Sequence, residues 1–431
     1  MGERFDICVV GAGIAGLTAA FLLVKNGFKV AVFERGEYPG SKNVSGGILQ
    51  TLDFSKIFDN FYNEAPLERY VSRRGIFLMS DQSAVNTNFI SAANDMPPHN
   101  HSFSVNRSNF DQWLAQKVEK AGGVIITRTL VDEIIRENGK FSGISTTRID
   151  GQVSCDAVIL AEGANSRLAI KSGMQKAHKP ENFVNVSKLV LSLSRDIIEE
   201  RFTLEGNQGA SLTFLGYPNS LMSSAFIHTN KESLSIGIGA FLDDLVKKKI
   251  RISTLMDGFL KHPIIRPLIS GGEPIEYSAH MIPEGGVSPN LVADGLLVLG
   301  DAAGLINPNP VFFEGMNLAA TSSILAAQVL VEARKKGDYS INALKKYSTL
   351  LEESYVMTDV RRYSELPRLI KNNPRLISVY PQLFNTVMQN LFEVDGKSKK
   401  EKRKHIMEII RKKRSILGLL RDAYTIYRRI L

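Results

Sequence analysis

The first 34 residues contain the pattern that restricts this chain most: an apolar strand, a glycine-rich turn, a helix and a second strand. Residues 5–10 read Phe-Asp-Ile-Cys-Val-Val, and the sequence Gly-x-Gly-x-x-Gly follows at once. Residues 14–26 are predicted as a helix, and residues 29–33 as a second strand that ends on Glu34. This order of elements is typical of an α/β fold that binds a dinucleotide.

The three glycines of the turn each have a physical role. Gly11 permits the tight turn from strand to helix, Gly13 lets a pyrophosphate approach the backbone, and Gly16 lets the helix pack close to the strand. The start of the helix also offers free N–H groups and the positive end of the helix dipole to phosphates. The residues predicted to hold the pyrophosphate are therefore Gly11, Ala12, Gly13, Ile14, Ala15 and Gly16.

Glu34 supports the same interpretation. It lies 18 residues after Gly16, where a carboxylate can bond ribose hydroxyls. The alternative is a tight turn in an α/β fold that binds nothing. That alternative does not explain why three glycines and a carboxylate occur together, so we favour the dinucleotide.

Length and cysteine content limit the class of protein. A chain of 431 residues is long enough for two or three domains and a large core. Its two cysteines, Cys8 and Cys155, form no disulfide framework and are too few for the four thiolates of an ordinary iron–sulfur cluster. So few cysteines suit a reducing interior, and we expect a cytoplasmic protein bound peripherally to the membrane. No run of 18 apolar residues occurs, so we predict no membrane-spanning helix.

The net charge of +9 is concentrated at one end of the chain. Residues 397–431 hold 13 of the 53 Lys and Arg residues and three of the 44 acidic residues, so this tail carries +10 and the rest −1. Such a tail suits an anionic membrane surface, an acidic protein or nucleic acid. Nucleic acid is not expected, because no aromatic residues are interleaved with the basic ones before Tyr424 and Tyr427.

Two later strands end in motifs of the same kind. Residues 155–161 form a buried strand that runs into Glu162-Gly163, and residues 295–300 form another that runs into Asp301. An acid and a glycine at the carboxyl end of a strand place polar groups where a nucleotide binds in α/β folds. Asp301 suits hydrogen bonding to a ribose or a polyol.

Two glycine-containing segments suggest close approach of the backbone to a flat group. One is the loop of residues 35–47, which ends in Gly46-Gly47. The other is Gly315, which precedes a predicted helix over residues 318–334. The N-terminus of that helix points its positive dipole end at whatever lies there.

The middle of the chain changes pattern. Residues 183–282 contain short strand-like segments separated by turns, which predicts an inserted, mostly antiparallel sheet domain. Earlier, Asn138-Gly139 predicts a hairpin turn. His99 and His101 could be mistaken for a metal pair, but no third ligand lies at a fitting spacing, so we predict no metal site.

The last hundred residues are predicted to be helical. One helix is expected over residues 342–355 and another over 374–392, bent at Pro381. After these, apolar residues recur at spacings of three and four between basic ones: Leu417, Leu420, Tyr424, Tyr427 and Leu431. This stripe either lies at a membrane interface or docks on the protein's own core.

Together the three separated motifs resemble the glutathione-reductase-type FAD fold of aromatic hydroxylases, prenyl reductases and quinone oxidoreductases. The resemblance implies that Glu34 holds the adenosine ribose, Arg107 the phosphate and ribityl region, and Asp301 the ribityl chain. Gly315, Met316 and Asn317 would face the isoalloxazine. The full implied cofactor site is Gly11, Ala12, Gly13, Ile14, Ala15, Gly16, Glu34, Arg35, Gly46, Gly47, Arg107, Val131, Glu162, Gly163, Gly300, Asp301, Gly315, Met316 and Asn317.

Within that superfamily the chain is most similar to the FixC family, relatives of electron transfer flavoprotein–quinone oxidoreductase. The matching segments are residues 34–43 with Gly46-Gly47, residues 228–237 and residues 261–286. The likeness extends to about residue 335. Where the FAD superfamily usually has Asp-Gly, this chain has Glu162-Gly163.

The resemblance implies three units and several partners. The units are an α/β FAD-binding Rossmann domain in three pieces (residues 1–80, 101–182 and 283–335), a quinone or substrate domain (183–282) and a helical C-terminal region (336–431). The implied partners are a two-subunit electron transfer flavoprotein, a ferredoxin-like iron–sulfur subunit, a membrane quinone and an anionic membrane surface. Because the flavin would carry the chemistry, no catalytic side chain is predicted.

Other functions fit the same residues. A geranylgeranyl or other prenyl-lipid reductase would use the same FAD fold with a long apolar pocket, and a flavin hydroxylase would also lack a second nucleotide motif. A candidate of another class is a non-catalytic flavoprotein that anchors a complex through its basic tail.

Overall fold

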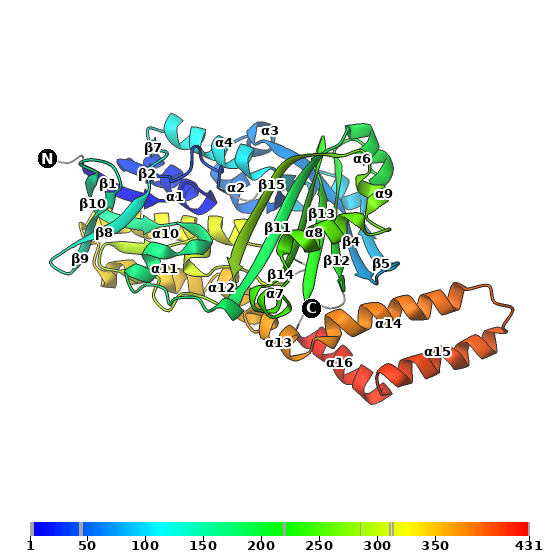
Figure 1. The fold of residues 1–431 in the computed structure, drawn as a ribbon. Coiled ribbons are helices and arrows are strands. Elements are labelled where there is room, and N and C mark those ends of the chain that lie inside the picture. Colours follow the sequence, from blue (N-terminus) through cyan, green and yellow to red (C-terminus); the bar gives the residue numbers. More distant parts are fainter. Residues whose placement is uncertain are drawn as a thin grey trace.

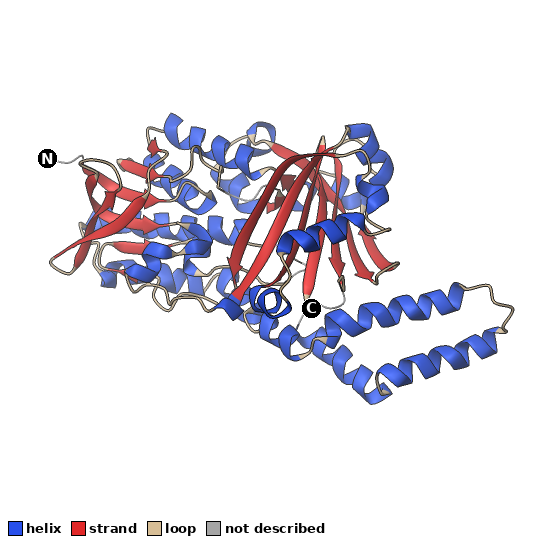
Figure 2. Cartoon of the chain, viewed as in Figure 1, coloured by secondary structure: helices blue, strands red, loops and turns tan. Residues whose placement is uncertain are grey.

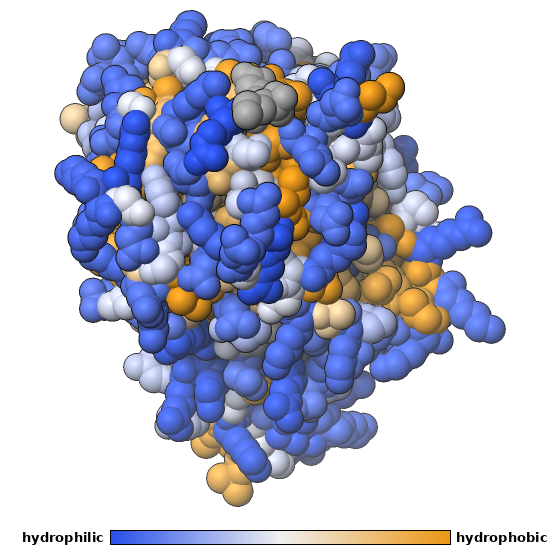
Figure 3. Space-filling model, turned by 90° about the vertical axis from the view of Figure 1, so that its left-hand side faces the viewer, coloured by the Kyte–Doolittle hydropathy of each residue, from blue (hydrophilic) through white to orange (hydrophobic). Residues whose placement is uncertain are grey.

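The computed structural model describes residues 4–42, 46–218, 221–284, 286–309, 312 and 314–429. Two sheets organise the chain, with helices packed around the first and a helical extension at the C-terminal end (Figures 1 and 2). Seen from the end where the first sheet and the N-terminus lie, the surface is largely hydrophilic with small apolar patches (Figure 3). The first sheet and its helices have the predicted Rossmann arrangement.

The first sheet is the parallel sheet that the opening motif predicts. Its order is β16 (Val292–Ala293), β17 (Leu296–Val298), β10 (Gln152–Leu160), β1 (Arg4–Val10), β2 (Val30–Phe33) and β7 (Val124–Ile126). In the register, Ile7 lies between Val30 and Ala157. The strands from β17 to β7 run parallel, so the motifs at the carboxyl ends of β1, β2, β10 and β17 meet at one edge.

Helices pack around this sheet. Helix α1 (Ile14–Lys25) follows the glycine turn and lies against α10 (Met316–Lys336) and α4 (Arg107–Lys120). Helix α10 is long and apolar enough to cross a membrane by length and composition, but 61% of its most apolar window is buried inside the protein. It is therefore a core helix.

A hairpin extends the same sheet from β10. Its strands are β8 (Val131–Glu137) and β9 (Lys140–Thr146). Between them Asn138 and Gly139 both have positive φ, 48° and 85°. The predicted Asn-Gly hairpin turn is confirmed, because such turns need two left-handed residues in sequence.

The second sheet is mostly antiparallel, as predicted, and has nine strands. Its order is β15 (Glu273–Pro283), β11 (Phe183–Ser192), β14 (Ser233–Phe241), β13 (Ser223–Thr229), β12 (Gln208–Leu215), β4 (Leu67–Met79), β6 (Ser102–Val105) and β3 (Gly47–Gln50), with β5 (Ala84–Ile90) on β4. Helices α6 (Arg195–Phe202) and α8 (Ile252–Lys261) cover one face.

This sheet takes in more of the chain than the segment 183–282. Strands β3 to β6 lie within residues 47–105, and β4 joins the sheet through a parallel pairing with β12. The sequence assigns residues 47–80 and 101–105 to the FAD-binding part, whereas the strands within them pair in the second sheet. Local pattern showed strands here but could not show their partner, which lies about 140 residues away.

Short helices connect the sheets to the C-terminal region. After α10 come α11 (Ile341–Glu352), α12 (Tyr355–Tyr363) and α13 (Leu366–Asn372). The helix expected over residues 342–355 is present as α11 but ends at Glu352, three residues earlier than predicted. Ser354 has an extended backbone and its hydroxyl donates to the carbonyl of Leu351, a local bond that competes with helix continuation.

The C-terminal hairpin, residues 375–429, projects from the body (Figure 1, orange to red). It consists of α14 (Arg375–Phe392), α15 (Lys399–Lys413) and α16 (Ile416–Arg429). Helix α14 continues through Pro381, whose ring packs where a Cβ on Gly216 would lie, 2.5 Å away. Contacts of α14 with β4 and β5 fix the hairpin to the second sheet.

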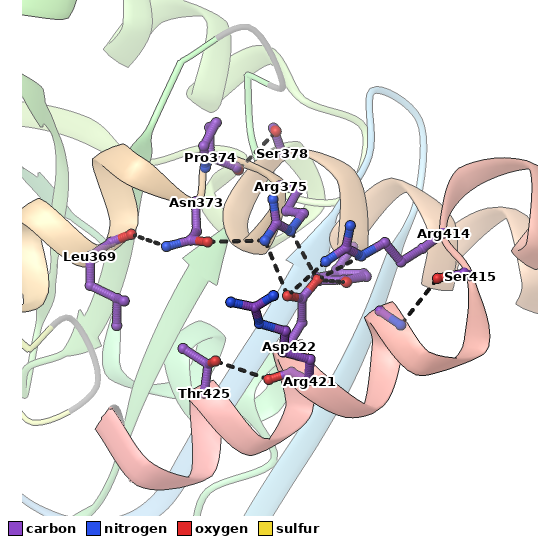
Figure 4. Close-up of polar contacts among 12 residues, drawn as sticks. Leu369, Asn373, Pro374, Arg375, Ser378, Arg414, Ser415, Arg421, Asp422 and Thr425 are labelled. Carbon is purple, nitrogen blue, oxygen red and sulfur yellow. Dashed lines mark hydrogen bonds and ion pairs between the residues drawn. The ribbon is translucent and has the colours of Figure 1, made fainter.

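One carboxylate joins the two ends of the C-terminal hairpin. Asp422 on α16 accepts from Arg375 Nε (2.9 Å) at the start of α14 and from Arg414 Nε (3.1 Å) (Figure 4). Tyr380 also donates to Asp422. The side chain of Asp422 is only 6% exposed, so these contacts form a buried ionic centre for α16.

Candidate flavin site

A cavity of about 720 Å³ lies between the carboxyl edge of the first sheet and one face of the second. The predicted site residues that line it are Gly11, Gly13, Ile14, Ala15, Glu34, Arg35, Gly46, Gly47, Arg107, Val131, Glu162, Gly163, Asp301, Gly315 and Met316. The structure thus brings together motifs from four distant parts of the chain. Ala12, Gly16, Gly300 and Asn317 do not line the cavity.

The glycine turn is built so that side chains cannot enter it. Gly11 has φ of +105°, and a Cβ there would lie 2.3 Å from the carbonyl oxygen of Ala161. A Cβ on Gly16 would lie 2.0 Å from the carbonyl oxygen of Gly11. Gly16 therefore serves helix–strand packing, as predicted from the motif.

The helix start faces the cavity with its backbone. Gly13 is the N-cap of α1 and supplies no capping side chain, and Gly13, Ile14 and Ala15 line the cavity. The first N–H groups of a helix have no partners within the helix, so this end attracts a phosphate.

Glu34 is held in place by two backbone groups. Its Oε2 accepts from the Ala12 N–H (3.0 Å), and its Oε1 accepts from the Gly36 N–H (2.6 Å). Ala12 thus acts through Glu34 and not as a cavity wall. The carboxylate lies at the carboxyl end of β2, where it can accept from a ribose.

Arg107 reaches the cavity from the first turn of α4. Its Nε and one terminal nitrogen donate to the two carboxylate oxygens of Asp111, at 3.1 and 2.9 Å, and the Asp111 side chain is fully buried. This bidentate pair fixes the guanidinium plane. Burial raises the pKa of Asp301, and the positive charge of Arg107 opposes that rise.

The side chain of Glu162, which is predicted to face the cofactor, binds backbone N–H groups of a neighbouring helix. Its carboxylate oxygens accept from the N–H groups of Leu168 (3.0 Å) and Ala169 (2.7 Å). Burial raises its pKa, while those bonds and Arg167 oppose the rise. The longer side chain of Glu therefore reaches the helix α5 (Arg167–Lys171), and its direct role toward a cofactor stays a prediction.

Two glycine-containing loops meet at the cavity. A Cβ on Gly46 would lie 2.1 Å from Ser235 Oγ, whereas a Cβ on Gly47 would approach only Met316 Cε, at 3.2 Å. Nothing lies within 4 Å of a Cβ built on Gly315. These loops give a flat ring access to backbone. Residues 43–45 of the predicted loop lie outside the described residues.

Asn317 and Gly300 support the site from behind. The Asn317 side chain is buried and donates to Gln50 Oε1 at 3.3 Å. A Cβ on Gly300 would lie 3.0 Å from Ala15 Cβ, so this glycine permits close packing of the Asp301 turn on α1.

The second sheet forms a wall that sequence reasoning missed. Alternate residues of three strands face the cavity: Val184, Val186 and Lys188 on β11, Ser224, Phe226 and His228 on β13, and His280 and Ile282 on β15. The two-residue period of each strand was visible in the sequence. Which face it lined depended on how the sheet packs.

Lys188 is the cation of this wall. Its Nζ donates to the carbonyl of Gly46 (3.1 Å) and lies 5.6 Å from the centre of the Phe226 ring. Burial, followed by the charge of Arg107, lowers the pKa of Lys188 to about 8, and Glu276 opposes the shift. A Cβ on Gly237 would lie 2.3 Å from Phe226, so that glycine makes room for the ring.

Two histidines beside it are held neutral. His228 stacks on Phe226, with ring centres 4.5 Å apart. Burial, then the charges of Lys188 and Arg74, lower the pKa of His228 to about 3. Burial and the neighbouring cations Lys188, Arg35 and Arg107 also lower the pKa of His280. The positive charge of the wall therefore comes from Lys188, with Arg35 and Arg107 lining the cavity beside it.

These features fit FAD. The cavity has a side-chain-free turn at a helix start for the pyrophosphate, Glu34 for a ribose, Asp301 and Arg107 for the ribityl region, and open glycines for a flat ring. FAD supplies one- and two-electron transfer when bound. Among the residues that the structure describes, no group of three or more His, Cys, Asp or Glu side chains could hold a metal ion.

Two family models match the chain. Residues 6–206 match the model described as glucose inhibited division protein A, and residues 366–431 match the ETF-QO/FixC family C-terminal domain. The second match covers the region for which the sequence motifs suggested no relative.

Curated relatives match over the whole length. Protein FixC of Azotobacter vinelandii is 40% identical over 434 residues, with 100% of each chain covered. A probable electron transfer flavoprotein-quinone oxidoreductase, YdiS of Escherichia coli strain K12, is 38% identical, with 97% of each chain covered.

Solved structures share the fold. A geranylgeranyl bacteriochlorophyll reductase-like protein of Thermoplasma acidophilum has a TM-score of 0.72 and 22% identity, covering 96% of this chain and 97% of that one. The flavin-dependent brominase Bmp2 has a TM-score of 0.65 and 17% identity, covering 95% and 100%. With a flavin cavity in place and identity of about two residues in five along its full length, the chain belongs to the FixC family, related to electron transfer flavoprotein–quinone oxidoreductase, and is an FAD-dependent oxidoreductase.

Proposed function

We propose that the protein receives electrons from a two-subunit electron transfer flavoprotein and passes them to a membrane quinone. The observation that carries the proposal is the full-length similarity to a probable electron transfer flavoprotein-quinone oxidoreductase. The substrate is then a flat ring with an apolar tail, and the acceptor site must lie beside the flavin.

The second-sheet wall suits such a ring. Val184, Val186 and Ile282 give it apolar contacts, and Lys188 supplies a cation next to an oxygen that gains negative charge on reduction. Ser224 lines the cavity, whereas the neighbouring Ser223 donates to the carbonyl of Tyr217 at 2.6 Å. The side chains of this protein would therefore position and polarise the quinone, and no nucleophile is required.

Membrane contact follows from the acceptor. On α16 the apolar residues Leu417, Leu420, Tyr424 and Tyr427 are all exposed, next to the basic residues of the tail. Of the two interpretations of this stripe, docking on the protein's own core finds no support in that exposure. We propose that the C-terminal hairpin rests on an anionic membrane surface, where each Lys or Arg contributes about 1 kcal/mol.

A separate iron–sulfur subunit is the remaining partner. Cys8 and Cys155 are both buried, and two cysteines cannot ligate an ordinary cluster. A ferredoxin-like subunit would have to bring its own cluster to the complex.

The test is anaerobic electron transfer with purified components. Reduced electron transfer flavoprotein should bleach the FAD absorbance of this protein, and a water-soluble quinone should restore it. FAD that stays oxidised beside the reduced donor contradicts the proposal and favours a docking subunit. Saturation of a geranylgeranyl lipid by the reduced protein, measured by mass spectrometry, contradicts it in favour of a prenyl reductase.

A further inference from the structure

A second cavity, of about 820 Å³, lies next to the flavin cavity. It is bounded by the end of β15, by α7 (Leu242–Lys248) and by helices α11 to α13. Exposed charged side chains stand around it: Glu181, Glu352, Arg361, Glu365 and Arg368. A polar cavity of this size at the surface can hold many water molecules.

Glu284 is the residue that the two cavities share. It directly follows Pro283, the last residue of β15, and its N–H donates to the carbonyl of Asn182 at 2.6 Å. Lys371, which also lines the second cavity, donates to the carbonyl of Glu181 (2.7 Å) and pairs with Asp243 (2.8 Å). Glu284 therefore borders both the second cavity and the flavin cavity.

The proposed reaction needs protons at this place. An electron transfer flavoprotein that gives up two electrons delivers no protons with them, whereas a quinone takes up two electrons and two protons to become a quinol. Those protons come ultimately from water and need a group at the edge of the flavin cavity that can hand them on.

We propose that Glu284 passes protons from the second cavity into the flavin cavity. The inference rests on the proposed function for the identity of the acceptor. Each transfer moves one proton from the Glu284 carboxyl to the flavin cavity, and water in the second cavity returns one proton to the carboxylate. No electron passes through Glu284.

The protonation of Glu284 fits this role. Burial raises its pKa to about 8, and the charge of Lys371 opposes the rise. At pH 7 the group is therefore mostly a carboxylic acid that can donate, and above pH 8 it becomes a carboxylate. The other charged and titratable residues that line the flavin cavity are Glu34, Arg35, Lys42, Arg107, Glu162, Arg167, Lys188, His228, His280, Asp301 and Glu314. Those that line the second cavity are Glu181, Asp243, Glu352, Arg361, Glu365, Arg368 and Lys371.

The direct test is infrared difference spectroscopy of the FAD-loaded protein during electrochemical reduction, without donor or quinone. The wild type should show a protonated-carboxyl band that changes on reduction and shifts in D₂O. The band should vanish in Glu284→Gln and persist in Glu365→Gln, which removes a carboxylate that lines only the second cavity. A band unchanged in Glu284→Gln would overturn the proposal.

The kinetic test follows quinone reduction against pH. Glu284→Gln should slow it at least about 10-fold at pH 7 and remove the decline above pH 8, while Glu284→Asp retains part of the rate. Ser364→Trp, which fills only the second cavity and leaves Glu284 in place, should also slow quinone reduction. Wild-type rate and pH profile in Glu284→Gln would overturn the inference. If the wild type shows the infrared band but does not reduce quinone at all, that result would contradict only the proposed acceptor.

Discussion

Lys188 and Arg107 place two cations beside the flavin cavity. Lys188 is held by the Gly46 carbonyl and Arg107 by Asp111, so neither side chain can turn away easily. Burial favours the neutral form of a lysine, and its hydrogen bond alone does not offset that cost. Such a residue is expected where a negative charge appears during function.

Removing the Lys188 charge should make the FAD harder to reduce. At separations of roughly 5 to 10 Å a unit charge interacts by about 2 kcal/mol, which is about 40 mV for a two-electron couple. We expect Lys188→Met to lower the FAD midpoint potential by about that amount at pH 7, measured by spectroelectrochemical titration.

The effect of Lys188 on the FAD midpoint potential should depend on pH. The pKa of Lys188 is lowered to about 8, so the cation is present at pH 7 and is lost as the pH rises through 8. The potentials of the wild type and Lys188→Met should therefore converge above pH 9. Lys188→Arg, which keeps the charge, serves as the matched control. An equal shift at all pH values would point to altered packing instead.

At the scale of elements, the C-terminal hairpin is held to the body by α14 and held together by one ionic centre. Helix α15 begins with a capping box, in which the Ser398 hydroxyl accepts from the Glu401 N–H and the Glu401 carboxylate accepts from the Ser398 N–H. Helix α16 has few buried residues, and Asp422 is the one buried polar residue that ties it to α14. The stability of α16 therefore depends on electrostatics more than on apolar burial.

Neutralising Asp422 should loosen α16 without disturbing the flavin site. Hydrogen bonds to a charged group contribute about 1.5 kcal/mol or more, so Asp422→Asn should speed tryptic cleavage after Arg421 or Arg428 about 10-fold. FAD content should stay unchanged. Equal cleavage rates in both proteins would show that other contacts hold the helix.

Acid should act in the same direction as that substitution. The hydrogen bond from Arg375, with those from Tyr380 and Arg414, lowers the pKa of Asp422 to about 2, below its value in an unfolded chain, about 4. Its stabilising contribution is therefore complete above pH 4 and is lost as the pH falls toward 2. Trypsin is inactive at such low pH, so this effect is measured by hydrogen exchange of residues 416–429.

At the scale of the molecule, the two sheets enclose the cavity and the C-terminal hairpin extends away from them (Figure 1). Apolar side chains on the hairpin are unusually exposed, among them Leu417 at 80% and Phe392 at 72%. The hairpin carries nearly all of the protein's net positive charge, and the body is almost neutral. This division suits a protein that is oriented by one end on a charged surface.

Changing the α16 stripe should abolish binding to that surface. Burying a leucine side chain contributes about 1.5–3 kcal/mol, so Leu417→Glu with Leu420→Glu should weaken sedimentation with anionic vesicles by at least about 100-fold. Both side chains are exposed, so folding and FAD content should not change. The control is Ile149→Glu, an exposed apolar residue on the body. Sedimentation that survives the double substitution would contradict the role of α16.

Much of the first sheet was predictable, because its motifs are local. The turn at residues 11–16, Glu34 and Asp301 could be placed at strand ends from periodicity alone, and parallel strands bring such ends to one edge. The glycine roles followed from sterics, which the distances at Gly11 and Gly16 match. The break at Ser354 and the capping use of Glu162 escaped prediction, because each depends on one side-chain hydrogen bond.

By itself the sequence determined the order of the elements, the glycine turn, the acidic strand ends and the uneven charge, since each is decided within a few neighbouring residues. Only the tertiary structure decided that β4 joins β12, that Lys188 and His228 of the second-sheet wall face the flavin cavity, and that Glu284 lines two cavities. These depend on contacts between segments more than a hundred residues apart, and a strand's own alternation shows two faces without showing what each will meet.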